Sequence, residues 1–309
     1  MPRGRSSGTA PGRPLAGGGC TLNMPMAEIT SIAVVGAGLM GSGIAESAAR
    51  AGVDVVLCDV DQAGVDRAQE RIERSLARAV QGGKMVDADA ASTRRRIKLT
   101  TDLDAIGDAE LVIEAVPEDE RLKLDVIAAI NAAVGGEVII ATNTSSIPIT
   151  QLARAVDNPA RVIGLHFFSP VPVMSLVEIV IAIDTGEPAV QAARAFATRL
   201  GKTTIESKDR AGFIVNMLLI PYLMAAVRMF EQGFASREDI DLGMKLGCGH
   251  PMGPLTLSDF IGLDVLHASG LSLHAEFKRE EYAPPPLLSR MVAAGRLGRK
   301  SGRGFYDYG

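Results

Sequence analysis

Short apolar runs alternate with amphipathic segments over the first two thirds of the chain. The runs predict strands at residues 31–35, 53–58, 97–99, 111–116, 138–142, 162–167, 176–183 and 203–206. The segments between them predict helices at 42–51, 65–80, 122–133, 149–154 and 187–200. Strands joined by helical crossovers form parallel sheets, so the pattern predicts an α/β fold with a doubly wound, mostly parallel sheet.

Strand signals disappear beyond residue 211, where helical patterns continue to the end of the chain. We expect a disordered tail over residues 1–26, which are rich in Gly, Pro, Arg and Ser, an α/β domain over 27–210 and an all-helical C-terminal domain over 211–309.

The apolar stretch 213–230 approaches the length of a membrane span, but Asn216, Pro221 and Arg228 interrupt it. It therefore predicts a buried or subunit-interface helix and no membrane association.

The composition is that of an ordinary globular protein, with 47% hydrophobic and 22% charged residues. A net charge of -4 argues against nucleic acid as a partner. Cys20, Cys58 and Cys248 are far apart and show no metal-ligand spacing, so we expect neither disulfides nor a metal site. The N-terminal segment lacks the apolar core of a signal peptide, which favours the cytoplasm.

A glycine-rich turn follows the first predicted strand and opens the first predicted helix, with the sequence Gly36-Ala37-Gly38-Leu39-Met40-Gly41. Gly36 permits the tight turn, Gly38 lets backbone amides approach a pyrophosphate, and Gly41 lets the helix pack against the strand. The helix N-terminus favours an anionic ligand. Strand, turn and helix in this order predict a Rossmann-like domain that binds a dinucleotide through this turn.

An acidic residue ends the second predicted strand. Asp59 is placed to accept hydrogen bonds from the adenosine ribose hydroxyls. Since the segment 59–61 contains a second acid, Asp61, and no arginine, a 2′-phosphate would meet repulsion there. We therefore expect NAD as the cofactor in preference to NADP.

Four arginines share one face of the helix predicted at 65–80, namely Arg67, Arg71, Arg74 and Arg78. Glu70 and Glu73 lie among them, so one interpretation is a solvated face with ion pairs between residues four apart. The other is a basic rail, extended by Lys84, for the phosphates of a bulky anionic substrate. The sequence leaves both interpretations open.

The candidate chemistry centres on His166 and Glu178. His166 ends one apolar run and Glu178 lies inside the next, and the turn at 169–172 could fold the two together. A carboxylate that holds the imidazole in one tautomer creates a general base for a hydroxyl, which beside a nicotinamide means alcohol dehydrogenation. A hydrogen-bonded core histidine and a structural salt bridge are the ordinary alternatives.

Other polar residues are placed to join this site. Asn143 and Ser145 follow a predicted strand, where the ligands of such sheets collect, and Asn216 opens an apolar helix. Each of these residues also has a turn or cap explanation.

Several motifs match one family from about residue 29 to the C-terminus. They are the glycine turn continued through Ser42-Gly43-Ile44-Ala45, then Ile113-Glu114-Ala115-Val116, Thr142-Asn143-Thr144-Ser145-Ser146, Gly164-Leu165-His166-Phe167-Phe168, Gly212-Phe213-Ile214-Val215-Asn216, His250-Pro251-Met252-Gly253-Pro254 and Lys300-Ser301-Gly302-Arg303-Gly304-Phe305-Tyr306. With these motifs the chain resembles the short-chain L-3-hydroxyacyl-CoA dehydrogenases, which include bacterial 3-hydroxybutyryl-CoA dehydrogenases. One departure is Ser169, where many members have asparagine.

The resemblance implies a role for each matching position. His166 would be the catalytic base, Glu178 its orienting partner, and Ser145 and Asn216 contacts to the oxygen atoms of the substrate. The remaining implied positions are Glu118, Lys123 and Asn143 at the cofactor, and Ser75 and Lys84 at coenzyme A. The resemblance also implies a homodimer formed through the helical domains.

The implied reaction is the NAD-dependent interconversion of a (3S)-3-hydroxyacyl-CoA, with a short acyl chain, and the 3-oxoacyl-CoA. One alternative keeps this chemistry but acts on a group bound to an acyl carrier protein, where Ser169 could signal a changed preference. Another is a non-catalytic NAD-binding structural protein on the same fold. A dehydrogenase with a catalytic lysine is disfavoured, because the helix that begins near Gly212 contains no lysine.

Overall fold

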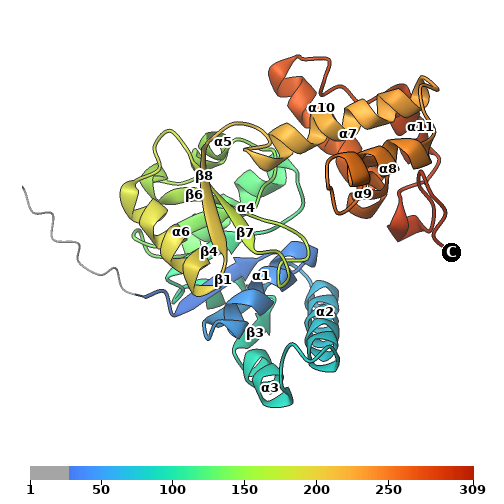
Figure 1. Cartoon of the computed structure of the whole chain (residues 1–309). Coiled ribbons are helices and arrows are strands. Elements are labelled where there is room, and N and C mark those ends of the chain that lie inside the picture. The colour runs from blue at the N-terminus through green and yellow to red at the C-terminus, as the bar shows by residue number, and fades with distance from the viewer. Residues whose placement is uncertain (1–27) are drawn as a thin grey trace, which may run out of the picture.

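The computed structural model describes residues 28–309 (Figure 1), so the tail predicted at 1–26 lies outside the described part. Within residues 28–309, eight strands form one sheet in the order β3-β2-β1-β4-β5-β6-β7-β8. Neighbouring strands are parallel except for β6 and β7, which are antiparallel. The strands are β1 (Ser31–Val35), β2 (Asp54–Cys58), β3 (Ile97–Thr100), β4 (Leu111–Glu114), β5 (Ile139–Thr142), β6 (Val162–Phe167), β7 (Leu176–Ile181) and β8 (Thr203–Lys208).

Helices cover both faces of this sheet because apolar side chains alternate along the strands. Ile32 and Val34 of β1 belong to the core under α1, α2 and α6, whereas Ala33 and Val35 belong to the core under α4 and α5. The helices are α1 (Leu39–Arg50), α2 (Gln62–Gln81), α3 (Asp87–Arg95), α4 (Glu120–Ala133), α5 (Ile149–Ala153) and α6 (Glu187–Arg199), with 3₁₀ turns at Leu103–Ile106 and Pro159–Arg161. The predicted doubly wound α/β sheet is confirmed.

The chain beyond β8 is helical and has a core of its own. Along α7 the buried positions Ile220, Leu223, Met224 and Val227 recur every three or four residues, as on one face of a helix. The helices are α7 (Val215–Glu231), α8 (Arg237–Gly247), α9 (Pro254–Ile261), α10 (Leu263–Phe277) and α11 (Pro286–Ala293), with a 3₁₀ turn at Arg299–Ser301. In the part of the chain that the structure describes, no helix has the length and hydropathy of a membrane span.

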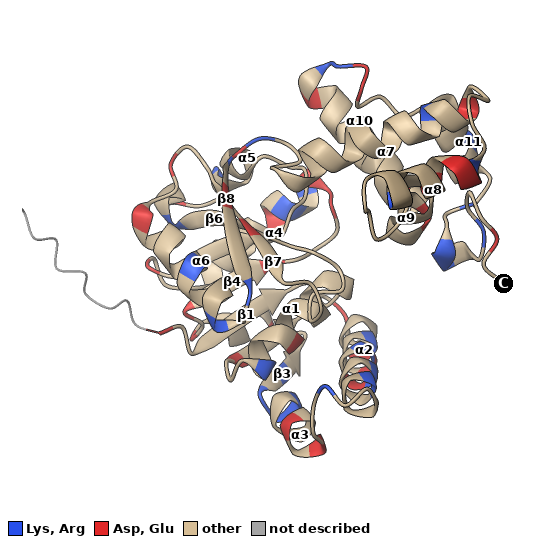
Figure 2. Ribbon diagram, viewed as in Figure 1, with Lys and Arg blue, Asp and Glu red and all other residues tan. Residues whose placement is uncertain are grey.

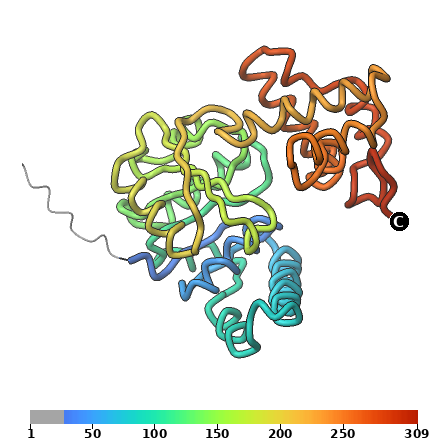
Figure 3. The backbone as a smooth tube through the Cα atoms, viewed as in Figure 1, coloured from blue at the N-terminus to red at the C-terminus, as the bar shows by residue number. Residues whose placement is uncertain are grey.

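The helices α2 and α3 form a hairpin, residues 62–95, at the β3 edge of the sheet. In Figure 3 this α2–α3 hairpin (cyan) and the helical part (orange to red) project from the α/β part as separate units. Ala68, Ile72 and Leu76 of α2 pack into the core shared with α1, which fixes the base of the hairpin. The hairpin is therefore anchored on α1, the helix that the glycine turn opens.

Two helices begin a turn earlier than the sequence predicts, and one helix was not predicted. The helix α1 begins at Leu39 instead of residue 42, because helical geometry starts within the glycine turn. The helix α2 begins at Gln62 instead of residue 65, because the carboxylate of Asp61 caps it by accepting a hydrogen bond from the Gly64 amide at 2.6 Å. The polar segment before β3, for which no helix was predicted, contains α3.

Candidate active site

The glycine turn has the shape that its sequence predicts. Gly36 has a φ of +104°, and a Cβ at Gly36 would lie 2.7 Å from the main chain of Ala115. A Cβ at Gly41 would lie 1.8 Å from the Gly36 carbonyl oxygen, so the helix can approach the strand only with glycine there. A Cβ at Gly38 would meet nothing within 4 Å, which leaves this position open to a ligand.

The first turn of α1 presents its amides at this open position. Gly38 is the N-cap residue and offers no side-chain hydrogen bond, and the first turn contains no acidic residue. Leu39 is 65% exposed, so the start of the helix is open to solvent. Free amide groups at a helix N-terminus suit a pyrophosphate, and Gly38, Leu39 and Met40 fit the dinucleotide role predicted for them.

Asp59 supports the same turn from the end of β2. Its Oδ2 accepts a hydrogen bond from the Ala37 amide at 2.7 Å, and its Oδ1 accepts one from the Val60 amide at 2.8 Å. A Cβ at Gly64 would lie 2.6 Å from Oδ1, so the start of α2 packs directly against the carboxylate. The segment 59–61 has no arginine, but the fold brings Arg71 of α2 to the turn, where its Nη1 donates to the Ala37 carbonyl at 3.1 Å.

A buried charge network lies at the carboxyl ends of β4 and β5. Lys123 is only 1% exposed, and its Nζ contacts Glu114 Oε1 at 2.8 Å, the Val116 carbonyl at 3.0 Å and Glu118 Oε2 at 3.5 Å. Glu114 is fully buried and also accepts hydrogen bonds from the Thr142 hydroxyl and the Val116 amide, both at 2.6 Å. Glu114 thus holds Lys123 next to Glu118, and Glu114 is an acid of the motif at 113–116 for which no role was predicted.

Glu118 fastens the segment that follows β5. Its Oε1 accepts hydrogen bonds from the Thr144 hydroxyl at 2.7 Å and from the amides of Ser145 and Ser146 at 2.9 Å. The Ser146 hydroxyl at 2.9 Å and the Ser145 hydroxyl at 3.2 Å approach the same oxygen. Burial alone would raise the pKa of Glu118, but the Lys123 ammonium and these hydrogen bonds lower it below its usual value. An anionic Glu118 therefore holds Ser145 at the sheet edge.

Asn143 connects the ends of β4, β5 and β6. Its amide donates to the Glu114 carbonyl at 2.8 Å, and its side-chain Oδ1 accepts a hydrogen bond from the Phe167 amide at 2.9 Å. Phe167 directly follows His166. Asn143 therefore lies beside the predicted catalytic residue and holds its strand end in place.

His166 and Glu178 face one another across the antiparallel pair β6 and β7, in direct register. His166 Nδ1 lies 2.6 Å from Glu178 Oε2, and the two residues are 6% and 0% exposed. The predicted approach of the two side chains through the turn at 169–172 is confirmed. Because Nδ1 donates to the carboxylate, Nε2 is left with the lone pair that a general base needs.

The other oxygen of Glu178 is held by the start of α7. Glu178 Oε1 accepts hydrogen bonds from the amides of Ile214 and Val215, both at 3.0 Å. Phe213, the residue before them, has a φ of +49°, an uncommon conformation for a bulky residue, and its ring packs 5.4 Å from the imidazole. The strained turn at Phe213 therefore places two backbone amides against the Glu178 carboxylate and an aromatic ring beside His166.

Asn216 lies in the first turn of α7, one residue after these amides. It is half-buried, and across residues 28–309 its side-chain amide forms no hydrogen bond. Its donor and acceptor are therefore free for a ligand near the His166 and Glu178 pair.

The predicted substrate residues Ser75 and Lys84 lie on the α2–α3 hairpin. The Ser75 hydroxyl donates to Glu46 Oε1 of α1 at 2.9 Å, and Lys84 is exposed. Figure 2 shows in blue where basic residues lie along α2. The four arginines of α2 form no ion pair with any residue from 28 to 309, so the ion pairs that one of the two interpretations expected with Glu70 and Glu73 are absent. Glu73 instead lies 3.9 Å from Arg94 of α3.

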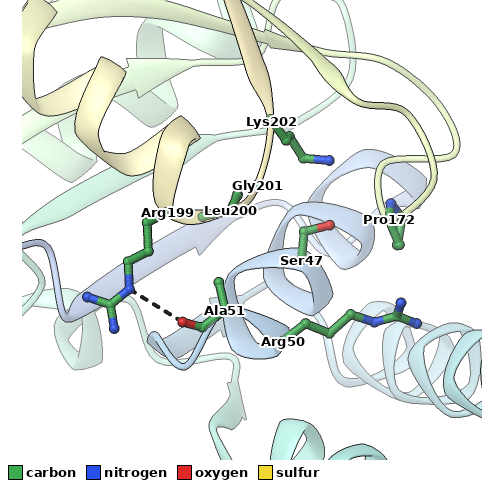
Figure 4. A pocket seen from close by; sticks show the side chains of 8 residues that line it. All are labelled: Ser47, Arg50, Ala51, Pro172, Arg199, Leu200, Gly201 and Lys202. Atoms are coloured by element: carbon green, nitrogen blue, oxygen red, sulfur yellow. Dashed lines mark hydrogen bonds between the residues drawn. The ribbon is translucent and has the colours of Figure 1, made fainter. Parts of the chain in front are cut away.

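A separate hollow of about 290 Å³ lies between the end of α1 and the loop before β8, and it contains none of the predicted site residues (Figure 4). Of the cations that line it, Arg50 pairs with Glu46, whereas Arg199 and Lys202 donate to main-chain carbonyls. Lys202 Nζ donates to the carbonyls of Val171 at 2.7 Å and Met174 at 2.8 Å, and burial lowers the Lys202 pKa. Lys202 therefore braces the turn that joins β6 to β7. Within the described residues, no group of His, Cys, Asp or Glu is placed to hold a metal ion.

Comparisons with known proteins identify the family. Residues 31–210 match the family model described as "3-hydroxyacyl-CoA dehydrogenase, NAD binding domain", and residues 212–308 match the corresponding C-terminal domain. A 3-hydroxybutyryl-CoA dehydrogenase of Mycobacterium tuberculosis is 50% identical over 282 residues, which are 91% of this chain and 99% of that protein.

Solved structures agree with this match. The crystal structure of M. tuberculosis FadB2 has a TM-score of 0.90 at 49% identity and covers 91% of this chain and 99% of its own. That of (S)-3-hydroxybutyryl-CoA dehydrogenase PaaH1 from Ralstonia eutropha has a TM-score of 0.87 at 45% identity with the same coverage. The predicted family and the NAD cofactor are thereby confirmed. The chain belongs to the 3-hydroxyacyl-CoA dehydrogenase family.

Proposed function

We propose that the protein interconverts (3S)-3-hydroxyacyl-CoA and 3-oxoacyl-CoA with NAD, and that its preferred acyl group is short, as in 3-hydroxybutyryl-CoA. The observation that carries the proposal is the buried pair of His166 and Glu178, at 2.6 Å, in a chain whose N-terminal part matches the NAD binding domain of this family. The relatives at 40–50% identity include proteins named 3-hydroxybutyryl-CoA dehydrogenase.

The residues around the glycine turn fit the cofactor. The open face at Gly38 and the free amides at the start of α1 would hold the pyrophosphate, and Asp59 would face the adenosine ribose. NAD, when bound, supplies the acceptor for the hydride that leaves C3 of the substrate.

His166 Nε2 takes the proton of the C3 hydroxyl as the C3–H bond gives up its hydride, so that the C–O bond becomes a carbonyl. In reduction the protonated imidazole returns the proton to oxygen. Glu178 stabilises the imidazolium, and the amides of Ile214 and Val215 keep this carboxylate charged and aligned. The pair is therefore organised before substrate binds.

Ser145 and Asn216 are the proposed contacts for the substrate oxygens. The Ser145 hydroxyl has the longest of the bonds to Glu118 Oε1, 3.2 Å, on an oxygen with four shorter donors. A carboxylate oxygen has about two lone-pair sites, so this hydroxyl can turn to a ligand at little cost. The Asn216 amide has no competing partner among residues 28–309.

The α2–α3 hairpin is the proposed contact for coenzyme A. The phosphates of coenzyme A would contact Ser75, Arg74 and Lys84. The basic residues of the hairpin suit these phosphates because the rest of the protein is slightly acidic. The relatives do not favour the alternatives of a carrier-protein handle or a non-catalytic protein. Rates with acyl-CoAs and with a carrier-bound substrate will also show whether Ser169 changes the acyl or carrier preference.

We further propose that the protein is a homodimer through its helical part and works in the cytoplasm. Four large apolar side chains of the helical part are 49–76% exposed in a single chain, namely Leu242 and Leu246 of α8, Phe260 of α9 and Leu271 of α10. A partner subunit would cover such a surface. Light scattering of the purified protein distinguishes the dimer from a monomer.

Steady-state rates followed by nicotinamide absorbance test the activity. We expect the highest kcat/KM with (S)-3-hydroxybutyryl-CoA among a series of longer acyl-CoAs and a carrier-bound substrate. His166→Gln should lower kcat by about 10²-fold or more, the usual scale for a positioned general base, without loss of NADH binding. No turnover of any acyl-CoA by the wild type, or near-normal turnover by the variant, would overturn the proposal.

A further inference from the structure

One arginine of the basic face on α2 is set apart from the others by its contacts. Arg71 is half-buried, whereas Arg67, Arg74 and Arg78 are exposed. Its Nη1 donates to the Ala37 carbonyl at 3.1 Å, inside the glycine turn. Arg71 is therefore fixed at the cofactor turn and not at the tip of the hairpin.

The position of Arg71 follows from the face of α2 that packs on α1. Gly64 contacts Asp59, Ala68 is fully buried, Arg71 reaches Ala37, and Ser75 donates to Glu46. These positions are spaced four, three and four residues apart, so they form one line along the helix. This line begins at the glycine turn and ends two turns further along α1.

The main chain of Ala37 is held at both its amide and its carbonyl group. Its amide donates to Asp59 Oδ2 at 2.7 Å, and its carbonyl accepts hydrogen bonds from the Ser42 hydroxyl at 3.0 Å and from Arg71. The guanidinium is thus locked within a few bond lengths of Gly38, where the open end of α1 begins.

The charge of Arg71 has no partner within the described residues 28–309. No carboxylate lies within ion-pair distance of it. Only Nη1 forms a hydrogen bond, and the other guanidinium nitrogens are not among the buried groups without a partner, so they remain open to solvent. A fixed, unpaired guanidinium beside a helix N-terminus suits a phosphate group of a ligand.

We propose that Arg71 is a cofactor-binding residue, whose guanidinium faces the pyrophosphate of NAD, and that Arg71, Arg74 and Lys84 serve two different ligands. The turn end, at Arg71, serves the dinucleotide. The outer end, with Arg74 and Lys84, serves coenzyme A. The second half of this division rests on the proposed function, whereas the role of Arg71 rests only on the binding of NAD.

Two substitutions distinguish the contribution of the Arg71 charge from that of its hydrogen bond to the Ala37 carbonyl. Arg71→Gln keeps a donor for the Ala37 carbonyl but removes the charge, and Arg71→Lys keeps the charge. Arg67→Gln is the matched control, since it removes the same charge one turn away from an exposed position that makes no contact with the turn. A purely structural role would leave the glutamine variant with normal nucleotide affinity.

Isothermal titration calorimetry of the full-length protein measures the affinities for NADH, for ADP-ribose, which retains the pyrophosphate, and for acetoacetyl-CoA. Arg71→Gln should weaken NADH and ADP-ribose equally, by about tenfold, and leave acetoacetyl-CoA within twofold. Arg71→Lys should recover most of the loss, and Arg67→Gln should stay within twofold of the wild type. Added salt should weaken NADH binding more steeply in the wild type than in Arg71→Gln.

Two results would overturn the assignment. One is an unchanged NADH affinity in Arg71→Gln, and the other is a loss confined to acetoacetyl-CoA. If Arg71→Gln folds poorly, as its melting temperature would reveal, Arg71→Met takes its place, since it also removes the charge and keeps a side chain of similar length; an unchanged NADH affinity in Arg71→Met would overturn the assignment in the same way. Failure of the proposed function would show separately, as a wild type that binds NADH but does not turn over acyl-CoA.

Discussion

Glu178→Gln tests the catalytic pair more sharply than removal of the histidine, because the surroundings of Glu178 dictate how the amide must lie. Two backbone amides, of Ile214 and Val215, point at Oε1 from 3.0 Å. Turning the glutamine NH₂ toward them would leave buried donors unsatisfied at about 1–3 kcal/mol each. The amide oxygen therefore stays with α7, and the NH₂ group faces His166.

The consequence is an inverted tautomer. With an NH₂ donor at the former Oε2 position, 2.6 Å from Nδ1, the imidazole must accept at Nδ1 and carry its proton on Nε2. That nitrogen can no longer take the hydroxyl proton. The imidazolium also loses a carboxylate whose attraction is worth about 4 kcal/mol at a separation near 4 Å and an effective dielectric constant of about 20. We expect kcat to fall by about 10³-fold, since each tenfold corresponds to about 1.4 kcal/mol.

Initial rates with saturating NAD and (S)-3-hydroxybutyryl-CoA measure this loss, and NADH titration checks that the cofactor site is intact. Glu206→Gln on the neighbouring strand β8 is the matched control, because it removes a carboxylate from an ion pair with Arg194 at the surface. It should leave kcat within twofold. A Glu178→Gln protein that is folded, binds NADH and keeps kcat within tenfold of the wild type would refute the tautomer argument.

Asp59 should favour NAD, so kcat/KM for NAD should exceed that for NADP by at least about tenfold in initial-rate measurements; equal use of both would contradict this role. Burial raises the pKa of Glu46 above 4.5 although Arg50 opposes it, so the folded state holds this proton more tightly than the unfolded chain. The wild type should therefore lose stability relative to Glu46→Gln as the pH rises from about 4.5 through the folded pKa, and parallel melting curves would refute the sign. Arg74→Gln combined with Lys84→Gln should raise KM for acyl-CoA by about tenfold and leave KM for NAD unchanged. An unchanged KM for acyl-CoA would place the phosphate contacts elsewhere.

The features that the sequence predicted are those set by neighbouring residues. The glycine turn depends on the main chain of residues 36–41, and its strand and helix follow directly from the hydrophobic pattern. The His166 and Glu178 pair is separated by only twelve residues and a turn, so two adjacent apolar runs were enough to place the carboxylate against the ring. The glycine turn and the pair were both predictable because the residues that form each of them are close in the sequence.

The features that escaped prediction depend on how distant elements pack. Arg71 looked equivalent to the other arginines on its helix, and only the packing of α2 on α1 distinguishes it. Glu114 lies at the end of an apolar strand, and its partner Lys123 is recognisable only once α4 returns over β4. A helical period identifies which residues share a face, but it does not identify what that face meets.

The position of Glu178 explains why this chemistry uses both parts of the chain. The histidine and its carboxylate lie on adjacent strands of the sheet, yet one carboxylate oxygen is held by the first amides of α7, the helix that opens the helical part. A carboxylate at a helix N-terminus is stabilised by the helix dipole as well as by the two hydrogen bonds. Because Asn216 lies on the same helical turn, any shift of α7 moves a proposed substrate contact and the support of the base together. The alignment of the catalytic base therefore depends on how α7 packs against the sheet.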